Sequence, residues 1–217
     1  MAVNHHASDE LLLAYAAGRM SAAPALVVAS HLAMSQEDAD RFSTFEQLGG
    51  ALLEEQPMAK VTPDLFEAML ARLDEPAPTD RIAVPLDHSA LDMGIDLPAP
   101  LAGRRIGKWR TISPGIRFAK VDVAEDSAFH VVLLRVGAGR ALPQHGHAGS
   151  ELTVILKGSF SDEGGTYGPG DFAEEDGHSN HQPVVSEDGE CICLTAIEGR
   201  LKPNNWLAML IMPFYGF

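Results

Sequence analysis

The sequence is poor in cysteine and in basic residues. Only two of its 217 residues are cysteines, Cys191 and Cys193, which excludes a framework of disulfides. Lys and Arg number 16 against 30 Asp and Glu, so the formal net charge is −14. Direct binding to DNA or RNA needs a basic surface, and this balance argues against it. An acidic chain suits instead a basic protein partner, or simply stays in solution.

Long apolar runs are also missing. The longest, such as Leu152–Leu156 and Ala208–Met212, are far shorter than the roughly 20 residues of a membrane-spanning helix. The start of the chain, Met1 to His6, lacks the basic residues and the apolar segment of a signal peptide. These absences predict a cytoplasmic protein with no membrane segment. With 46% apolar residues, the chain is too apolar to be mainly disordered.

The first part of the chain, to about Leu73, has apolar residues at helical spacing. Ser8, Ser21 and Ser35 are expected to precede the first three helices, and Thr62-Pro63-Asp64 the fourth. The helices are predicted to bury a small shared core. Its expected members are Leu11, Leu12, Tyr15, Ala16, Leu26, Val27, Phe42, Phe45, Leu48, Leu52, Leu65, Phe66, Met69, Leu70 and Leu73. So small a bundle often depends on a partner or a metal.

The character of the chain changes twice after the helices. Residues 76–100 are rich in proline and predict an extended linker. From about Leu101 the apolar period becomes two, with strand-length runs at 127–136, 151–160 and 191–197 separated by glycine-containing turns. The predicted fold is therefore α+β with two domains, a bundle of four helices over residues 1–75 and an all-β sandwich or barrel over residues 101–217.

Histidines and a carboxylate gather at the start of the second predicted strand. Side chains alternate along a strand, so His145 and His147 point to one face, and Glu151 can return to it after a short bend. Two imidazoles and a carboxylate on one face predict a site for a first-row metal. A further ligand is expected from a neighbouring strand, where His178 and His181 are the candidates.

This part of the chain resembles the cupins. Their first motif, G-x5-H-x-H-x3-E-x6-G, is matched at every position from Gly139 to Gly158. Their second motif, G-x5-P-x-G-x2-H-x3-N, begins at Gly170 and favours His181 over His178 as a ligand. The sequence departs from it at Asp176, His178 and Val185, and these changes affect turn geometry more than ligation.

The cupin resemblance implies a β-barrel of the jelly-roll type that holds one divalent metal. The implied ligands are His145, His147, Glu151 and His181. Three histidines and one glutamate can hold zinc, iron, manganese or nickel, and zinc is the metal we expect.

The two cysteines lie on one face of a predicted strand. Small buried core residues are the favoured interpretation of Cys191 and Cys193, because a disulfide between such close neighbours would be strained. A redox role remains the alternative if they face the metal.

The N-terminal part resembles the zinc-binding domain of ChrR-type anti-sigma factors. The matching stretches are His5-His6, Ser8–Leu12, Tyr15–Gly18, Leu26–Leu32 and Gly49–Glu55. Those proteins join this helical domain to a C-terminal cupin, so the resemblance covers nearly the whole chain. It implies an anti-sigma factor whose helices bind a group IV, extracytoplasmic-function sigma factor one to one. It also implies release of that sigma factor when the cupin senses an oxidative signal such as singlet oxygen.

Charge agrees with such a partner. Residues 1–75 hold four Lys and Arg against twelve Asp and Glu, whereas sigma factors need basic surfaces for DNA and polymerase. The other interpretation is that these acids are only the solvated faces of helices.

One departure from the family concerns its N-terminal zinc site, H…H-x3-C-x2-C. This sequence keeps His6 and His31 but has Ser35 and Asp38 in place of the cysteines. Serine is a negligible zinc ligand, whereas aspartate can serve. Either His6, His31 and Asp38 bind a metal more weakly, or the helices hold together without metal and Ser35 is only a helix cap.

An enzyme is the alternative of a different class. Many cupins with three histidines and one glutamate are dioxygenases, isomerases or decarboxylases. Against it, no cluster of arginines that could anchor a substrate lies near the motif, where Arg135 and Arg140 are the obvious cations, and the helical part has no evident catalytic use. A metal-storage module would leave the helices without a purpose.

Overall fold

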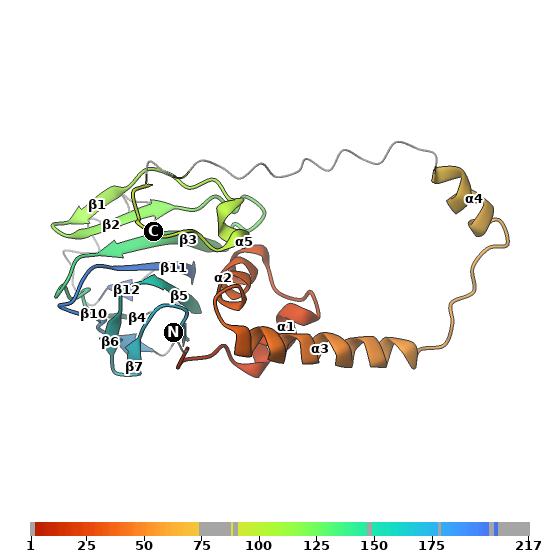
Figure 1. Ribbon diagram of the computed structural model, residues 1–217, viewed down its shortest axis with the longest axis horizontal. Coiled ribbons are helices and arrows are strands. Elements are labelled where there is room, and N and C mark those ends of the chain that lie inside the picture. The colour runs from red at the N-terminus through yellow and green to blue at the C-terminus, as the bar shows by residue number, and fades with distance from the viewer. Residues whose placement is uncertain are drawn as a thin grey trace.

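The computed structural model describes residues 3–73, 88, 91–146, 149–177, 179–199 and 202–203, the last two in backbone only. The helix at Ala22–Leu32 lies against a body of β-strands, and the helices before and after it in the chain pack beside it. The helix at Leu65–Arg72 stands apart, at the far end of an extended segment (Figure 1). Within these residues, no helix combines the length and the apolar character that crossing a membrane requires.

The first three helices begin where Ser8, Ser21 and Ser35 predict, whereas the fourth begins two residues later than Thr62 and Pro63 predict, after Asp64. Helix α1 (Asp9–Ala16) follows Ser8, whose Oγ accepts a hydrogen bond from the Leu11 amide, and Gly18 beyond its end adopts a φ of 63°. Helix α2 spans Ala22–Leu32, helix α3 spans Gln36–Glu54, helix α4 spans Leu65–Arg72 and the short α5 spans Ala99–Ala102. The Oγ of Ser35 accepts from the Asp38 amide and so caps α3.

The prediction that all four helices share one core is wrong for α4 and for the second half of α3. Helices α1, α2 and α3 contact one another, and Tyr15 of α1 stacks near Phe42 of α3 with ring centroids 5.2 Å apart. Helix α4 buries none of its residues, and Leu48 and Leu52 of α3 are each about half exposed. Helical periodicity identifies an apolar face, but it does not say whether the same chain covers that face.

The β-body contains one large and two small antiparallel sheets. The large sheet has the strand order β1-β2-β3-β11-β5-β8, and the small ones β10-β6-β7 and β12-β4-β9. The three predicted strand regions are confirmed by β3, β5 with β6, and β11. The strands are β1 (Arg110–Ser113), β2 (Ile116–Lys120), β3 (Phe129–Val136), β4 (His145–Gly146), β5 (Glu151–Lys157), β6 (Phe160–Asp162), β7 (Gly165–Tyr167), β8 (Phe172–Glu175), β9 (Asn180–His181), β10 (Val184–Val185), β11 (Cys191–Glu198) and β12 (Lys202–Pro203).

The two faces of the large sheet bury different cores. Along β11, Ile192, Leu194 and Ala196 belong to a core shared with helices α1 and α2, whereas Cys191 and Cys193 belong to a second core among the strands. Strand alternation produces this division. One face of the sheet is therefore continuous with the helical part, and the other lines the interior of the β-body.

The chain contacts this body before the predicted start of the β-domain. Leu91 and Met93 are buried in the core shared with the helices, together with Leu101 of α5. Residues 74–87, which include the first part of the predicted linker, lie outside the described residues. The boundaries at 75, 100 and 101 stay a prediction.

Candidate functional site

Two of the predicted ligands come together on neighbouring strands. His145 of β4 and His181 of β9 are direct register partners, and their ring centroids lie 4.7 Å apart. Side chains of directly opposed residues lie on the same side of a sheet, so both imidazoles belong to one site. His147 and His178 lie outside the described residues. The full set of His145, His147, Glu151 and His181 therefore stays a prediction.

Glu151, the third predicted ligand, lies opposite another carboxylate. It begins β5 and is the register partner of Glu175 on β8. The pKa of Glu151 is raised to about 7, mainly by burial and in small part by the charge of Glu175, while His181 and a hydrogen bond from Thr153 oppose the rise. A nearby positive charge stabilises the ionised form of a carboxyl group that is buried in this way, and a metal would supply such a charge.

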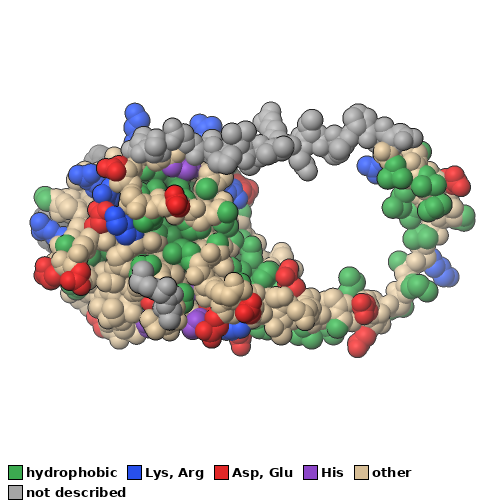
Figure 2. Space-filling model, in the orientation of Figure 1, with side chains coloured by type: hydrophobic (Ala, Val, Ile, Leu, Met, Phe, Trp, Pro, Cys, Tyr) green, Lys and Arg blue, Asp and Glu red, His purple; other side chains and the backbone are tan. Residues whose placement is uncertain are grey.

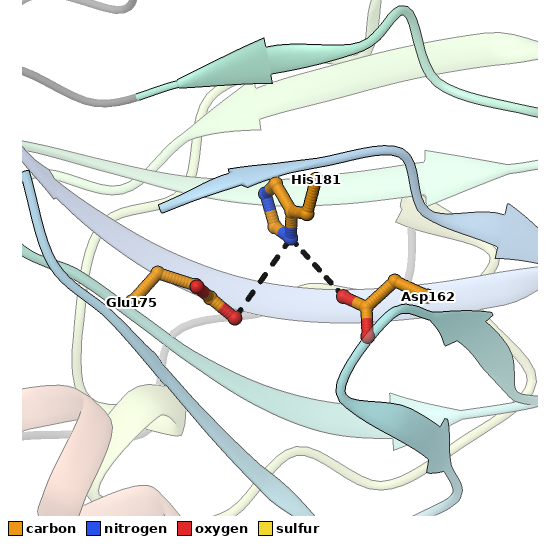
Figure 3. A group of neighbouring side chains, drawn as sticks. All are labelled: Asp162, Glu175 and His181. Atoms are coloured by element: carbon orange, nitrogen blue, oxygen red, sulfur yellow. Dashed lines mark hydrogen bonds and ion pairs between the residues drawn. The ribbon is translucent and has the colours of Figure 1, made fainter. Parts of the chain in front are cut away.

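Asp162, Glu175 and His181 form a tight group (Figure 3). Their potential ligand atoms all lie within 4.8 Å of one another. The Nδ1 atom of His181 is 3.0 Å from Asp162 Oδ2 and 3.9 Å from Glu175 Oε1. Sequence reasoning missed both carboxylates. Glu175 directly precedes Asp176 of the second motif, but its register opposite Glu151 is a tertiary fact, and nothing in the sequence marks Asp162.

Hydrogen bonds fix the tautomers of the two rings. The Nδ1 atom of His145 lies 2.8 Å from the carbonyl oxygen of Pro143, so this nitrogen donates and the lone pair sits on Nε2. A donation from His181 Nδ1 to Asp162 gives that ring the same tautomer. Metal-binding histidines are commonly oriented in this way.

The charge state of His145 suits a metal as well. Burial lowers the pKa of His145, and the nearby charge of His181 adds to this, although the Pro143 carbonyl opposes it. A neutral imidazole is the form that binds a cation. The described residues of the barrel thus fit a divalent metal, and nothing in them selects zinc over its neighbours.

The turn between Glu175 and His181 replaces the turn of the cupin motif. The Asp176 amide donates to Ser179 Oγ at 3.2 Å, and the Ser179 amide donates to Asp176 Oδ1 at 3.0 Å. These reciprocal bonds close the turn without the proline and glycine of the motif. The departure at Asp176 therefore leaves His181 in place opposite His145.

Cys191 and Cys193 are buried thiols, and no disulfide joins them. Burial raises the pKa of Cys193 to about 12, and the charge of Glu151 adds to this rise. Burial raises the pKa of Cys191 as well. The interpretation as small core residues is confirmed, although hydrogen bonds link Cys193 through Thr195 and Thr153 to Glu151.

A second polar cluster lies where the helices meet the barrel. Asp38 Oδ2 is 2.5 Å from His31 Nε2 and 3.0 Å from His6 Nδ1, and Asp38 Oδ1 pairs with Arg41. Burial alone would raise the pKa of Asp38, but hydrogen bonds from His31, His6 and Arg41 hold it below its ordinary value. His31 also contacts the barrel, since its Nδ1 atom lies 2.8 Å from the carbonyl oxygen of Gly170.

A third feature is an exposed apolar surface on α3 and α4, which we call the α3–α4 surface. Figure 2 shows apolar side chains gathered on α4 and along α3. Phe66 is 67% exposed and Leu53 is 74% exposed, which is unusual for such large side chains in a monomer. The residues that form this surface are Leu48, Leu52, Leu53, Leu65, Phe66, Met69, Leu70 and Leu73.

Comparison with known proteins covers both parts of the chain. Residues 105–199 match the family described as the ChrR cupin-like domain. The chain is 38% identical over 224 residues to the anti-sigma-E factor ChrR of Cereibacter sphaeroides, and the match covers 99% of each protein. It is also similar to a chain of the crystal structure of Rhodobacter sphaeroides SigE in complex with the anti-sigma ChrR. That match has 35% identity and a TM-score of 0.73, and it covers 90% of this chain and 99% of the other.

Proposed function

Because this chain belongs to the ChrR family of anti-sigma factors, we propose that its N-terminal helices sequester a group IV sigma factor in a one-to-one complex. The complex forms in the cytoplasm, as the sequence predicts. An oxidative signal acting on the cupin barrel releases the sigma factor.

The α3–α4 surface carries this proposal. Its large apolar side chains are exposed in the chain alone, and burial of such side chains against a partner is favourable by about 1.5–3 kcal/mol each before the costs of association. None of the residues of α4 is buried in the chain alone, so we expect a partner to cover this helix. The excess of acids over bases in residues 1–75 adds attraction to a basic sigma factor.

The barrel supplies the metal-dependent part of the proposal. His145, His147, Glu151 and His181 would hold the ion, with Asp162 orienting His181 and Glu175 lying opposite Glu151. A bound zinc ion would act as a Lewis acid and would hold strands β4, β5 and β9 together. Strand pairing fixes the position of the site. His145 lies on β4, which pairs with β9, and Glu151 lies on β5, which pairs with β11.

Enzyme chemistry in the barrel is the weaker candidate. Arg135, one of the two arginines near the motif in sequence, pairs with Glu190 at 2.7 Å and lies 5.9 Å over the ring of Trp109. Its charge is therefore compensated, so Arg135 is a poor anchor for an anionic substrate. We propose that the barrel is a sensor and catalyses no reaction.

Co-expression of the full chain with candidate group IV sigma factors tests the proposal. We expect one of them to co-purify in a stable one-to-one complex, with a mass measured by light scattering. The chain with Phe66→Asp and Leu70→Asp on α4 is the matched variant, and it should lose the complex. Failure of every group IV sigma factor to bind, together with metal-dependent O2 consumption by the chain alone, would favour an enzyme.

A further inference from the structure

The second polar cluster occupies the position of the zinc site found in the helical domain of the family. His6 and His31 stand where that site has histidines, and Ser35 and Asp38 where it has cysteines. Binding of a zinc ion by these four residues would be independent of the proposed sigma factor and of the metal of the barrel.

The distances in the cluster leave no room for zinc. Zinc lies about 2.0–2.1 Å from nitrogen and oxygen ligands, in tetrahedral geometry. His31 Nε2 and Asp38 Oδ2 are 2.5 Å apart, so an ion bound to both would subtend an angle of about 75° instead of about 109°. In the described part of the chain, the group of potential ligands close enough together for one ion lies in the barrel.

A cationic side chain already faces the Asp38 carboxylate without an ion. Arg41 pairs with Asp38 Oδ1 and, at 2.5 Å, with Asp9, so a guanidinium supplies the positive charge that a metal would otherwise bring. The Oγ of Ser35 is occupied as the cap of α3, where it accepts from the Asp38 amide at 3.3 Å. A hydroxyl in that position is no substitute for a thiolate.

Hydrogen bonds account for both nitrogens of His31. One faces the Gly170 carbonyl oxygen at 2.8 Å and the other faces Asp38 Oδ2, and both of these oxygens are acceptors. Neither ring nitrogen of His31 is therefore directed at a space that an ion could fill. His31 and Asp38 are fully buried, so they form a buried hydrogen-bonded pair where the family site has a metal.

We propose that this chain has no zinc in its helical domain, and that the Asp38-centred cluster replaces it as the link between the N-terminal segment, α2 and α3. The replacement is caused by Ser35 and Asp38. Through His31 the same cluster fixes the helices to the barrel at Gly170.

The N-terminal segment strengthens this link on the barrel side. The amides of Asn4 and His5 donate to Asp171 Oδ1 at 2.6 and 3.1 Å, and the Phe172 amide donates to the His5 carbonyl oxygen at 2.9 Å. The ring of His5 lies 4.2 Å from that of Tyr167. The Asp38-centred cluster and the N-terminal segment therefore both form hydrogen bonds with the turn between β7 and β8.

Elemental analysis of the full chain tests the proposal. The parent variant carries His145→Ala and Glu151→Ala, which removes two predicted ligands of the barrel, so that metal in the helical domain is counted separately. After incubation with Zn²⁺ and gel filtration, we expect the parent to hold the same amount of zinc with and without the further change His31→Ala. Adding Ser35→Cys and Asp38→Cys to the parent should yield a gain of one zinc per chain.

Two results of that analysis would overturn the proposal. One is zinc in the parent that is lost with His31→Ala, because the natural residues would then bind metal. The other is the absence of any gain with the two cysteines, because Ser35 and Asp38 would then not be the cause of the loss.

Thermal unfolding tests the structural role of the cluster. Asp38→Asn keeps the shape and removes the charge, and we expect it to lower the unfolding midpoint by about 6 °C or more. Asp40→Asn, an exposed change two residues along α3, is the matched control and should have no such effect. A chelator should leave the difference between these two variants unchanged. Equal midpoints for the two variants would contradict the assignment.

Discussion

Asp162 Oδ2 and His181 Nδ1 lie 3.0 Å apart, and this contact decides which ring nitrogen of His181 carries the lone pair. The two residues come from different small sheets, since Asp162 ends β6 and His181 lies on β9. Asp162 is almost fully buried, so the bond is shielded from water. The contact gives Asp162 a role that neither cupin motif marks, because this residue lies between the two motifs.

Asp162→Asn is expected to weaken the metal site without abolishing it. A residue that orients a metal-binding histidine typically contributes a factor of about 10–100 in metal affinity. The measurement is a zinc competition titration against a chromogenic chelator, with the exposed Asp188→Asn as control. If Asp162→Asn removed zinc as completely as His181→Ala, Asp162 would be a direct ligand instead.

The thiols of Cys191 and Cys193 are expected to be unreactive in the folded protein. With a pKa of about 12, Cys193 has a thiolate fraction of about one in ten thousand at pH 8, and the thiolate is the reactive form. A thiol reagent at pH 8 should therefore label both residues only after denaturation. Ala51→Cys on the exposed part of α3 supplies a control thiol that reacts at once. Fast labelling of the native cysteines would argue for the redox role.

The α3–α4 surface is expected to tolerate polar substitutions in the free chain but not in the complex. Leu70→Asp should weaken binding of the sigma factor by at least tenfold, about 1.4 kcal/mol, because it places a charge in an apolar contact. The free energy of unfolding should change by about 0.5 kcal/mol or less, because α4 has no buried residue and Leu70 is 43% exposed. Affinity is measured by titration calorimetry.

A substitution on the barrel provides the control for that experiment. Ile112 of β1 is 39% exposed, similar to Leu70 at 43%, but it lies in the large sheet, far from α4 in Figure 1. Ile112→Asp should leave the affinity unchanged. Equal losses from Leu70→Asp and Ile112→Asp would mean that α4 is not the contact.

Asp171→Ala is expected to release the N-terminal segment from the barrel. The Asp171 carboxylate accepts from the amides of Asn4, His5 and Gly168, and loss of a buried acceptor costs about 1–3 kcal/mol. Hydrogen exchange of the amides of Asn4, His5 and Phe172 should accelerate, while exchange in β3 and β11 stays slow. Unchanged exchange at Asn4 and His5 would show that the segment is held by other contacts.

Local chemistry in the sequence determined a large part of the structure. The caps Ser8 and Ser35 marked the starts of α1 and α3 because their hydroxyl groups accept from amides only three residues away. Strand alternation likewise placed Cys191 and Cys193 on one face of β11. These relationships involve neighbours along the chain, so spacing alone expresses them. The approach of His181 to His145 followed from the cupin resemblance, whose motif fixes both positions.

Only the tertiary structure decided which residues from distant parts of the chain lie opposite one another. Glu175 faces Glu151 because β8 pairs with β5 in one register, and His31 reaches Gly170 across 139 residues of sequence because α2 packs on the barrel. The exposure of α4 was equally invisible, since an amphipathic pattern is the same whether its apolar face meets its own chain or a partner. The sequence by itself determined which residues form helices and strands and which of them have metal-binding chemistry. The packing of distant segments decided which side chains share a site, because burial, register and charge pairing depend on contacts that spacing along the chain does not encode.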